Sequence, residues 1–204
     1  MQTELIIFQL IILIYSVILH EIAHGAAALR FGDRTAQYMG RLTLNPIPHL
    51  DMFGSILLPA ILYFSGSPFL FGWAKPVPVN EANLNPQRLG SLVVSIAGVA
   101  TNFLLAIFFI VLAKIIGGDT VLTLCYIGAL TNVALAIFNL IPIPPADGYR
   151  ILETILPYNL RRSIDNFFAQ YGAMAMILTI PLSVLIFRAI FPTLATSIYK
   201  LIFS

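Results

Sequence analysis

The feature that most constrains this chain is a set of apolar runs that are too long for a globular core. Residues Leu5 to Leu19 are almost uninterrupted in their apolar character, and Leu89–Ile116 and Thr120–Leu140 are similar. About 20 apolar residues in a helix span the hydrocarbon core of a bilayer. Of the 204 residues 59% are hydrophobic and only 10% charged, whereas a soluble domain has about 25% charged residues. The sequence therefore predicts a membrane protein whose main solvent is lipid.

We expect a single all-α polytopic domain with four to five membrane-spanning helices. Glu4 stands where a signal peptide carries basic residues, so the first apolar helix is expected to remain in the mature protein. The domain covers residues 1–204, with a core at 1–156 and C-terminal helices at 157–204. The predicted spans are Leu5–Leu19 extended to Arg30, Leu89–Ile116, Thr120–Leu140, Tyr171–Phe187 and, as a tilted span or an interfacial helix, Ala189–Phe203.

Two irregular elements are expected between the first and second of these spans. Thr35–Asn45 lies between glycines and prolines and predicts a short β-ribbon at the membrane surface. This ribbon either presents a strand edge to an extended peptide or only covers the surface. Phe53–Trp73 is apolar but is interrupted by Pro59 and by the break Ser65–Pro68, so we expect it to re-enter the membrane instead of crossing it.

One motif inside the first apolar helix carries chemistry. His20-Glu21-Ile22-Ala23-His24 has the pattern H-E-x-x-H, whose i, i+4 spacing puts both imidazoles on one helix face within reach of one zinc ion. Glu21 lies beside them, where a carboxylate can act as general base on water. Ionisable residues inside the membrane are costly and mark functional sites by default. The motif therefore predicts a metal site within the bilayer.

A catalytic zinc has three protein ligands, so the third has to come from elsewhere in the chain. His49 is one candidate, in a proline-rich stretch. Asp147 is the better candidate, because it follows the proline-dense segment Ile141–Ala146 at the end of a predicted span. Taken alone, Asp147 is equally well explained as the N-cap of a following helix. Beside two histidines that need a partner, the ligand interpretation is favoured.

These motifs together resemble a known family. HEIAHG followed by FNLIPIPPADGYR is similar to the site-2 protease family of intramembrane zinc metalloproteases, and FGWAKPVPVN and AGVATN resemble its small bacterial and archaeal members without a PDZ domain. The likeness covers Ser16 to Leu156, and Ala146 departs from the large apolar residue that commonly precedes the motif aspartate. The resemblance implies hydrolysis of peptide bonds in or near the membrane-spanning segments of single-span membrane proteins, with the lipid bilayer as surroundings.

The resemblance also implies roles for individual residues. His20, His24 and Asp147 would bind one Zn²⁺ per chain, and Glu21 would be the general base. Asn139 matches an asparagine of the family motif and would donate a hydrogen bond to the substrate carbonyl or oxyanion. Its alternative role is an amide bond between helices.

Other functions and roles compete with this interpretation. An ion or proton transporter would also place a His, Glu and Asp cluster in the membrane, but it does not explain the i, i+4 histidines, and no inverted repeat supports it. Nucleic acid is an unexpected partner, since the net charge is only +2 and no basic tract is present. Asn102 and Gly98 form a small-residue face that we attribute to helix packing, not catalysis. The oligomeric state is not predicted.

The metal site fixes a topology. His24 and Asp147 follow the first span and Thr120–Leu140 respectively, so both spans end at one membrane face, and Phe53–Trp73 has to return to that face. Basic residues favour the cytoplasm, which predicts a multi-pass protein of the cell membrane with its active site near the cytoplasmic face. Lys114 and Arg188 fall on the other face. The basic residues expected on the active-site face are Arg30, Arg34, Arg41, Lys75, Arg88, Arg150, Arg161 and Arg162.

Overall fold

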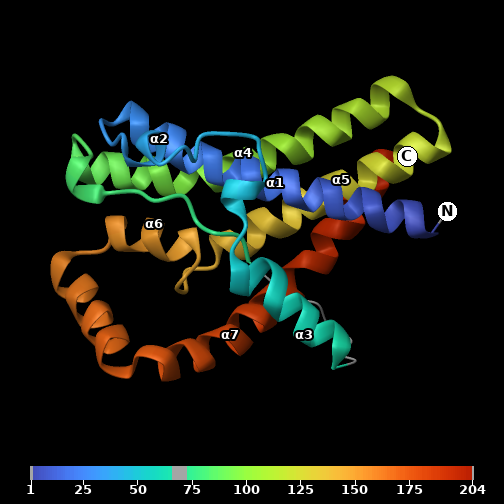
Figure 1. Ribbon diagram of the computed structural model, residues 1–204. Coiled ribbons are helices and arrows are strands. Elements are labelled where there is room, and N and C mark those ends of the chain that lie inside the picture. The colour runs from blue at the N-terminus through green and yellow to red at the C-terminus, as the bar shows by residue number, and fades with distance from the viewer. Residues whose placement is uncertain (1, 66–72, 204) are drawn as a thin grey trace.

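The computed structural model describes residues 2–65 and 73–203, and within these ranges the chain is built of helices joined by irregular segments (Figure 1). Four of the described helices are long and apolar enough to cross a membrane. The prediction of an all-α multi-pass membrane protein is thereby confirmed. The four are Thr3–Arg30 within α1 (Gln2–Arg30), α4 (Gln87–Ile116), α5 (Asp119–Leu140) and Pro181–Phe203 within α7 (Tyr158–Phe203).

Helix α4 is the centre of the bundle and packs against both α1 and α5. Small residues make this contact close: Ala106 and Ala113 of α4 and Ala129 of α5 are buried in one cluster. A Cβ added at Gly128 would lie 2.7 Å from the ring of Phe109. In membranes, helices associate through such close packing of small residues. The three helices form the frame on which the site is built.

The C-terminal part of the chain differs from the prediction of two spans at Tyr171–Phe187 and Ala189–Phe203. One helix, α7, runs from Tyr158 to Phe203, and Gly172 (φ 41°, ψ −118°) interrupts its regular backbone. Within the part of α7 whose residues are fully described, Pro181–Phe203 has the length and hydropathy of a span. The proposed break near Arg188 is absent because Pro181 and Pro192 are both accommodated inside the helix. The protein therefore has four candidate spans in the described residues.

The structure does not confirm the β-ribbon at Thr35–Asn45. Residues Thr35–Tyr38 form the one-turn helix α2, and turns and bends follow it. The physical reason is local: the buried carboxylate of Asp33 accepts hydrogen bonds from the amide and hydroxyl of Thr35 at the start of this helix. Gly40, with φ 63°, then ends it. The amides from Tyr38 to Arg41 donate to carbonyls three to five residues earlier, so they are not free to pair between strands.

Two described stretches, residues 47–65 and 73–80, lie between α2 and η3 in the chain. Trp73 donates its amide to the Gly54 carbonyl (3.1 Å), and Ser55 donates its hydroxyl to the Trp73 carbonyl (2.8 Å), so the chain at residue 73 is again beside residue 54. The turn expected at Ser65–Pro68 lies largely outside the described residues. The short helices here are η1 (Ile47–His49), the π-helical η2 (Met52–Leu57), α3 (Leu58–Phe64) and η3 (Glu81–Asn83).

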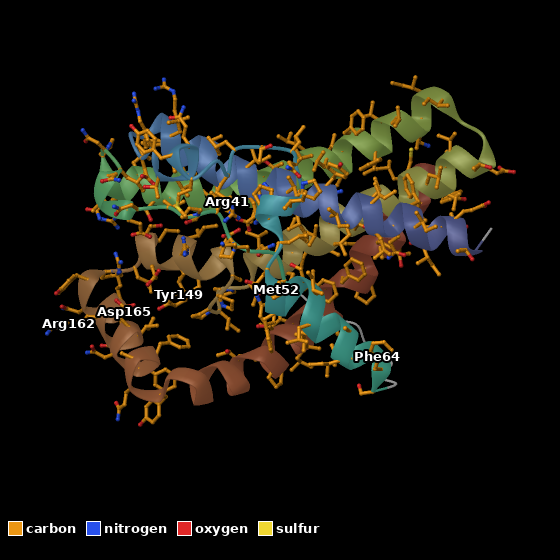
Figure 2. All side chains as sticks on the ribbon, in the orientation of Figure 1. Arg41, Met52, Phe64, Tyr149, Arg162 and Asp165 are labelled. Atoms are coloured by element: carbon orange, nitrogen blue, oxygen red, sulfur yellow. The ribbon has the colours of Figure 1, made fainter. Side chains whose placement is uncertain are left out.

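Residues 73–80, which we call the strap, are extended and carry no regular secondary structure. The strap ends at Asn80, whose amide donates to the Asp33 carboxylate (2.8 Å). Helix α6 (Asp147–Ile155) follows α5 through the proline-rich turn. Tyr149 of α6 and Asp165 of α7 lie at the same end of the bundle, whereas Phe64 marks the tip of α3 (Figure 2). The end of α1, the start of α4 and α6 thus share one end of the molecule (Figure 1).

Candidate metal centre

Helix α1 supplies two imidazoles to the centre. The i, i+4 spacing of His20 and His24 places their rings on one face, with the two Nε2 atoms 3.0 Å apart. Both side chains are nearly enclosed, with exposed fractions of 8% and 10%. The predicted convergence of the two histidines is therefore present in the structure.

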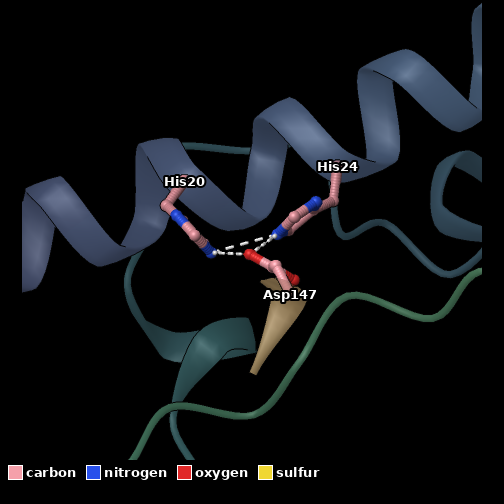
Figure 3. A group of neighbouring side chains, drawn as sticks. All are labelled: His20, His24 and Asp147. Carbon is pink, nitrogen blue, oxygen red and sulfur yellow. Dashed lines mark hydrogen bonds and ion pairs between the residues drawn. The ribbon is translucent and has the colours of Figure 1, made fainter. Parts of the chain in front are cut away.

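Asp147 completes a three-residue cluster with these histidines. Its Oδ2 lies 3.2 Å from Nε2 of His20 and 3.2 Å from Nε2 of His24 (Figure 3). Asp147 is the first residue of α6, and the cap position belongs to Ala146. The N-cap role that the sequence left open for Asp147 is therefore wrong.

Gly148 explains how Asp147 reaches the histidines. A Cβ at Gly148 would collide with the last carbonyls of α5, at 2.7 Å from the oxygen of Ile141. Only glycine lets α6 begin this close to the end of α5. The Asp-Gly pair thus combines a ligand with the residue that permits its placement.

The spacing of the three ligand atoms suits a small metal ion. Zinc bound tetrahedrally at about 2.0–2.1 Å has ligand atoms about 3.3 Å apart. The observed separations of 3.0, 3.2 and 3.2 Å are close to that value. Burial raises the pKa of the Asp147 carboxyl, but the imidazoles of His20 and His24, when protonated, outweigh burial and lower the pKa to about 2. An ionised carboxylate and two imidazoles are a ligand set typical of catalytic zinc.

The other ring nitrogen of each histidine faces a hydrogen-bond acceptor. His24 Nδ1 lies 2.7 Å from the carbonyl oxygen of Val94, which can only accept, so this nitrogen carries the proton. His20 Nδ1 lies 2.6 Å from Oδ1 of Asn102. Both contacts leave the Nε2 lone pairs directed at the cluster. Such outer contacts fix the tautomer of metal-binding histidines.

Gly98 of α4 provides the space in front of the cluster. A Cβ at this position would lie 2.6 Å from Cε1 and 2.7 Å from Nε2 of His20, and would also collide with Nε2 of His24. We assigned Gly98 and Asn102 to helix packing from the sequence. The close approach of α4 to α1 at Gly98 agrees with packing, and both residues also lie against the histidines of the cluster.

Glu21 lies next to the cluster and is engaged by the strap. Its Oε2 accepts a hydrogen bond from the amide of Val77 at 2.6 Å. Pro76 and Pro78 flank Val77 and have no amide hydrogen, so Val77 is the donor that these three residues can offer. The Val77 side chain is buried against Gly25, where a Cβ would lie 3.0 Å from it. The strap therefore fixes the carboxylate that the motif assigns as general base.

Two other predicted residues lie outside the cluster. His49 is buried, but its Nε2 lies 2.9 Å from the carbonyl oxygen of Thr43, and its own carbonyl accepts the amide of Lys75. The described residues contain one group of three potential ligands, and His49 is not part of it. Asn139 donates to the carbonyl of Leu135 in its own helix (3.0 Å), so the structure does not show the interhelical amide bond.

Sequence reasoning missed Val77 and Asn132 as neighbours of the site. The signal for Val77 was available, because a Pro-Val-Pro triplet offers only one amide. Asn132 carried a weaker signal, as a lone amide in the middle of an apolar span.

Comparisons with known proteins identify the family. Residues 8–123 and 116–183 match the model of peptidase family M50. This chain belongs to peptidase family M50. It is 41% identical over 169 residues to a Bacillus subtilis protein named "Putative zinc metalloprotease YwhC", covering 78% of this chain and 74% of the relative. It is 31% identical over 153 residues to "Putative zinc metalloprotease Rip2" of Mycolicibacterium smegmatis, covering 73% of this chain but only 57% of that relative. No solved structure matches.

Membership in family M50, the site-2 protease family, agrees with the resemblance found in the motifs. The protein is a metalloendopeptidase that uses zinc and is embedded in a membrane by several apolar helices. The three-residue cluster described above has the donor set and spacing that this cofactor requires.

Proposed function

We propose that His20, His24 and Asp147 hold the zinc ion, and that the enzyme hydrolyses peptide bonds in or near the membrane-spanning segments of single-span membrane proteins. The observation that carries the proposal is the place of the ligands. Both histidines lie within the apolar helix Thr3–Arg30, and the third ligand atom lies 3.2 Å from each. A metal centre inside a span acts on peptide bonds at membrane depth.

Zinc held by three protein ligands polarises a carbonyl group and lowers the pKa of water to about 7. The residues of this chain supply the remaining steps. Glu21, held by the Val77 amide, takes the proton from the attacking water and delivers it to the leaving amine.

Asn139 is proposed to orient the substrate. It is the penultimate residue of α5, and the span leads into the turn that delivers Asp147. The amide that now bonds to the Leu135 carbonyl can turn to donate to the carbonyl oxygen of the scissile bond. The Leu135 carbonyl already belongs to the helix, so it loses only an additional donor when the Asn139 amide turns away.

The substrate has to be extended where it is cut. A peptide in a helix has its carbonyls engaged in backbone bonds, and in lipid these bonds are replaced only by other partners. Helix-destabilising residues near the cut therefore promote cleavage, and replacing them by leucine should slow it. Equal rates on an all-leucine segment would contradict this substrate preference.

We place the centre near the cytoplasmic face of the cell membrane. Arg30 lies in the last turn of α1, Arg88 in the first turn of α4 and Arg150 in α6, whereas Lys114 and Lys200 lie in the last turns of α4 and α7. Basic residues favour the cytoplasmic side, which supports this placement. Arg188 lies inside the span of α7 and not beyond it. We propose further that Phe53–Trp73 re-enters the membrane, which the contacts between residues 73 and 54 support.

Cleavage of a co-expressed single-span protein tests the proposal, with Glu21→Gln as the matched control. The carboxamide keeps the shape and volume of Glu21 but cannot accept the proton, so cleavage should fall by at least about 100-fold while zinc remains bound. A transporter that uses the same cluster would show no cleavage in either form. Undiminished cleavage by Glu21→Gln would remove Glu21 as the general base.

A further inference from the structure

A row of buried amides connects His20 to helix α5. Asn102 and Asn132 are both 0% exposed, although they lie in the middle of membrane spans. Asn102 Nδ2 donates to Asn132 Oδ1 at 3.0 Å, and Asn132 Nδ2 donates to Ser16 Oγ at 2.9 Å and to the Gly128 carbonyl at 2.9 Å. Buried amides are costly unless every group is paired, so this arrangement has few alternatives.

The Gly128 carbonyl sets the direction of the row. A carbonyl oxygen accepts and never donates, so the NH₂ group of Asn132 has to face it. Asn132 Oδ1 is then turned toward Asn102 and accepts from the NH₂ group of that residue, which also approaches the Ser16 carbonyl at 3.5 Å. Asn102 Oδ1 consequently faces His20 Nδ1, which it approaches to 2.6 Å. The imidazole therefore carries its proton on Nδ1.

Reversing the row would be unfavourable at both ends. At Gly128, two oxygens would face each other across 2.9 Å. At His20, the NH₂ group of Asn102 would face Nδ1 and require its lone pair, which moves the proton of the neutral ring to Nε2. A protonated Nε2 cannot bind a metal ion.

We infer that Asn132 is a positioning residue for the zinc ligand His20, acting through Asn102 and fixed in orientation by the Gly128 carbonyl. This inference rests on the proposed role of His20. Helix α5 thus selects the tautomer of a histidine on α1 without touching it. His24 achieves the same result directly, through the Val94 carbonyl of α4.

Three variants separate this role from general packing. Asn132→Leu keeps the side-chain shape and removes the acceptor, so zinc affinity, measured by competition with a chromophoric chelator, should fall about 10- to 100-fold. The protonated carboxyl of Asn132→Asp can donate to the Gly128 carbonyl and present its other oxygen to Asn102, so this variant should restore affinity to within a few-fold of wild type. Ser16→Ala removes a partner of Asn132 but leaves the Gly128 anchor, so affinity should be unchanged.

The nitrogen-15 resonances of the three histidines in the metal-free protein at pH 9 give a second readout. His20 Nδ1 should be protonated in wild type, Ser16→Ala and Asn132→Asp, and partly deprotonated in Asn132→Leu. His49 is an internal reference of opposite tautomer, because its Nε2 faces the Thr43 carbonyl. If Asn132→Leu does not fold, a deprotonated Nδ1 of His20 in the wild-type protein overturns the inference by itself.

The outcomes also distinguish this inference from the proposed function. If wild type and Asn132→Leu bind zinc with equal affinity and show equal protonation of His20 Nδ1, the positioning role of Asn132 is overturned. The proposed ligands then stay in place. Failure of the wild-type protein to bind zinc overturns the proposed ligands, while the nitrogen-15 resonances still report on the row of amides.

Discussion

Gly98 is a residue whose only contribution is the absence of a side chain. The atoms that would meet a Cβ at Gly98 belong to both histidines, on the side from which α4 approaches. Gly98→Ala should therefore displace the imidazoles and lower zinc content to below about a tenth of wild type. Metal analysis of the purified variant checks this, with Leu104→Ala as the control, since this side chain of α4 is 66% exposed. Full zinc occupancy in Gly98→Ala would show that the cluster tolerates the methyl group.

Val77 acts through its backbone, so only proline at this position removes the interaction. Val77→Pro deletes the amide that Glu21 accepts at 2.6 Å and keeps the extended course of the strap. The general base loses its fixed position, and the turnover number should fall about 100-fold with zinc content unchanged. Val77→Ala is the matched control because it retains the amide. Equal turnover in Val77→Pro and Val77→Ala would mean that the strap does not position Glu21.

The chemistry of the ligands could be predicted from the sequence, but their surroundings could not. His20, Glu21 and His24 are four residues apart at most, so helical geometry alone brings them together. The prediction of Asp147 rested on an additional argument, namely that a catalytic zinc has a third protein ligand. Gly98, Asn102 and Asn132 depend on which faces of α4 and α5 are turned toward α1, and apolar spans carry almost no periodic signal that would reveal this.

At the scale of elements, Asp33 joins the end of α1 to the strap and to η3. Its buried carboxylate accepts hydrogen bonds from Thr35, the Asn80 amide and the Asn83 side chain. Burial raises the pKa of Asp33, but these hydrogen bonds outweigh burial and hold the pKa below its ordinary value of 3.8. The carboxylate thus contributes stability above pH 4, and this contribution is lost as the pH falls through the lowered pKa.

Asp33→Asn should lower the free energy of unfolding by about 2–3 kcal/mol at pH 7, since hydrogen bonds to a charged acceptor are replaced by weaker ones. The loss should shrink as the pH falls below about 4, because Asp33 of the unfolded chain is then protonated while the folded protein still holds the carboxylate ionised. Thermal unfolding of both proteins in detergent at pH 7 and pH 3 checks this. A difference in stability that is independent of pH would contradict the role of the charge.

The junction of α5 and α6 depends on Gly148. A methyl group there meets backbone atoms, which cannot turn away as side chains do. Gly148→Ala should cost about 1–3 kcal/mol of stability and move Asp147 away from the histidines. Unfolding in detergent together with zinc content measures both effects. Wild-type zinc content in Gly148→Ala would show that α6 need not lie this close to α5.

The same limits explain which elements the sequence predicted. Hydropathy predicted the three long spans, because an apolar helix of this length matches the thickness of a bilayer. The ribbon at Thr35–Asn45 was wrong because the Asp33 carboxylate and the turn at Gly40 favour the one-turn helix α2 over an extended chain. The division of α7 into two spans was wrong because proline inside a membrane helix does not end it when its neighbours are satisfied.

At the scale of the whole molecule, the four spans put both chain termini at the end opposite the metal centre (Figure 1). Single cysteines in a Cys125→Ala background should therefore label from opposite sides. A cysteine at Ala82, in η3, should react only from the cytoplasm, and one at Gly118, between α4 and α5, only from outside. Labelling of both positions from the same side would contradict the arrangement of the spans.

Zinc stoichiometry in ligand variants tests the proposed centre most directly. Purified wild-type protein should contain one zinc ion per chain, and Glu21→Gln and His49→Ala should retain it. His20→Ala, His24→Ala and Asp147→Ala should each lose most of the metal, because a three-ligand site with one ligand removed binds zinc weakly. Full zinc content in Asp147→Ala, or loss of zinc in His49→Ala, would contradict the assignment of the ligands.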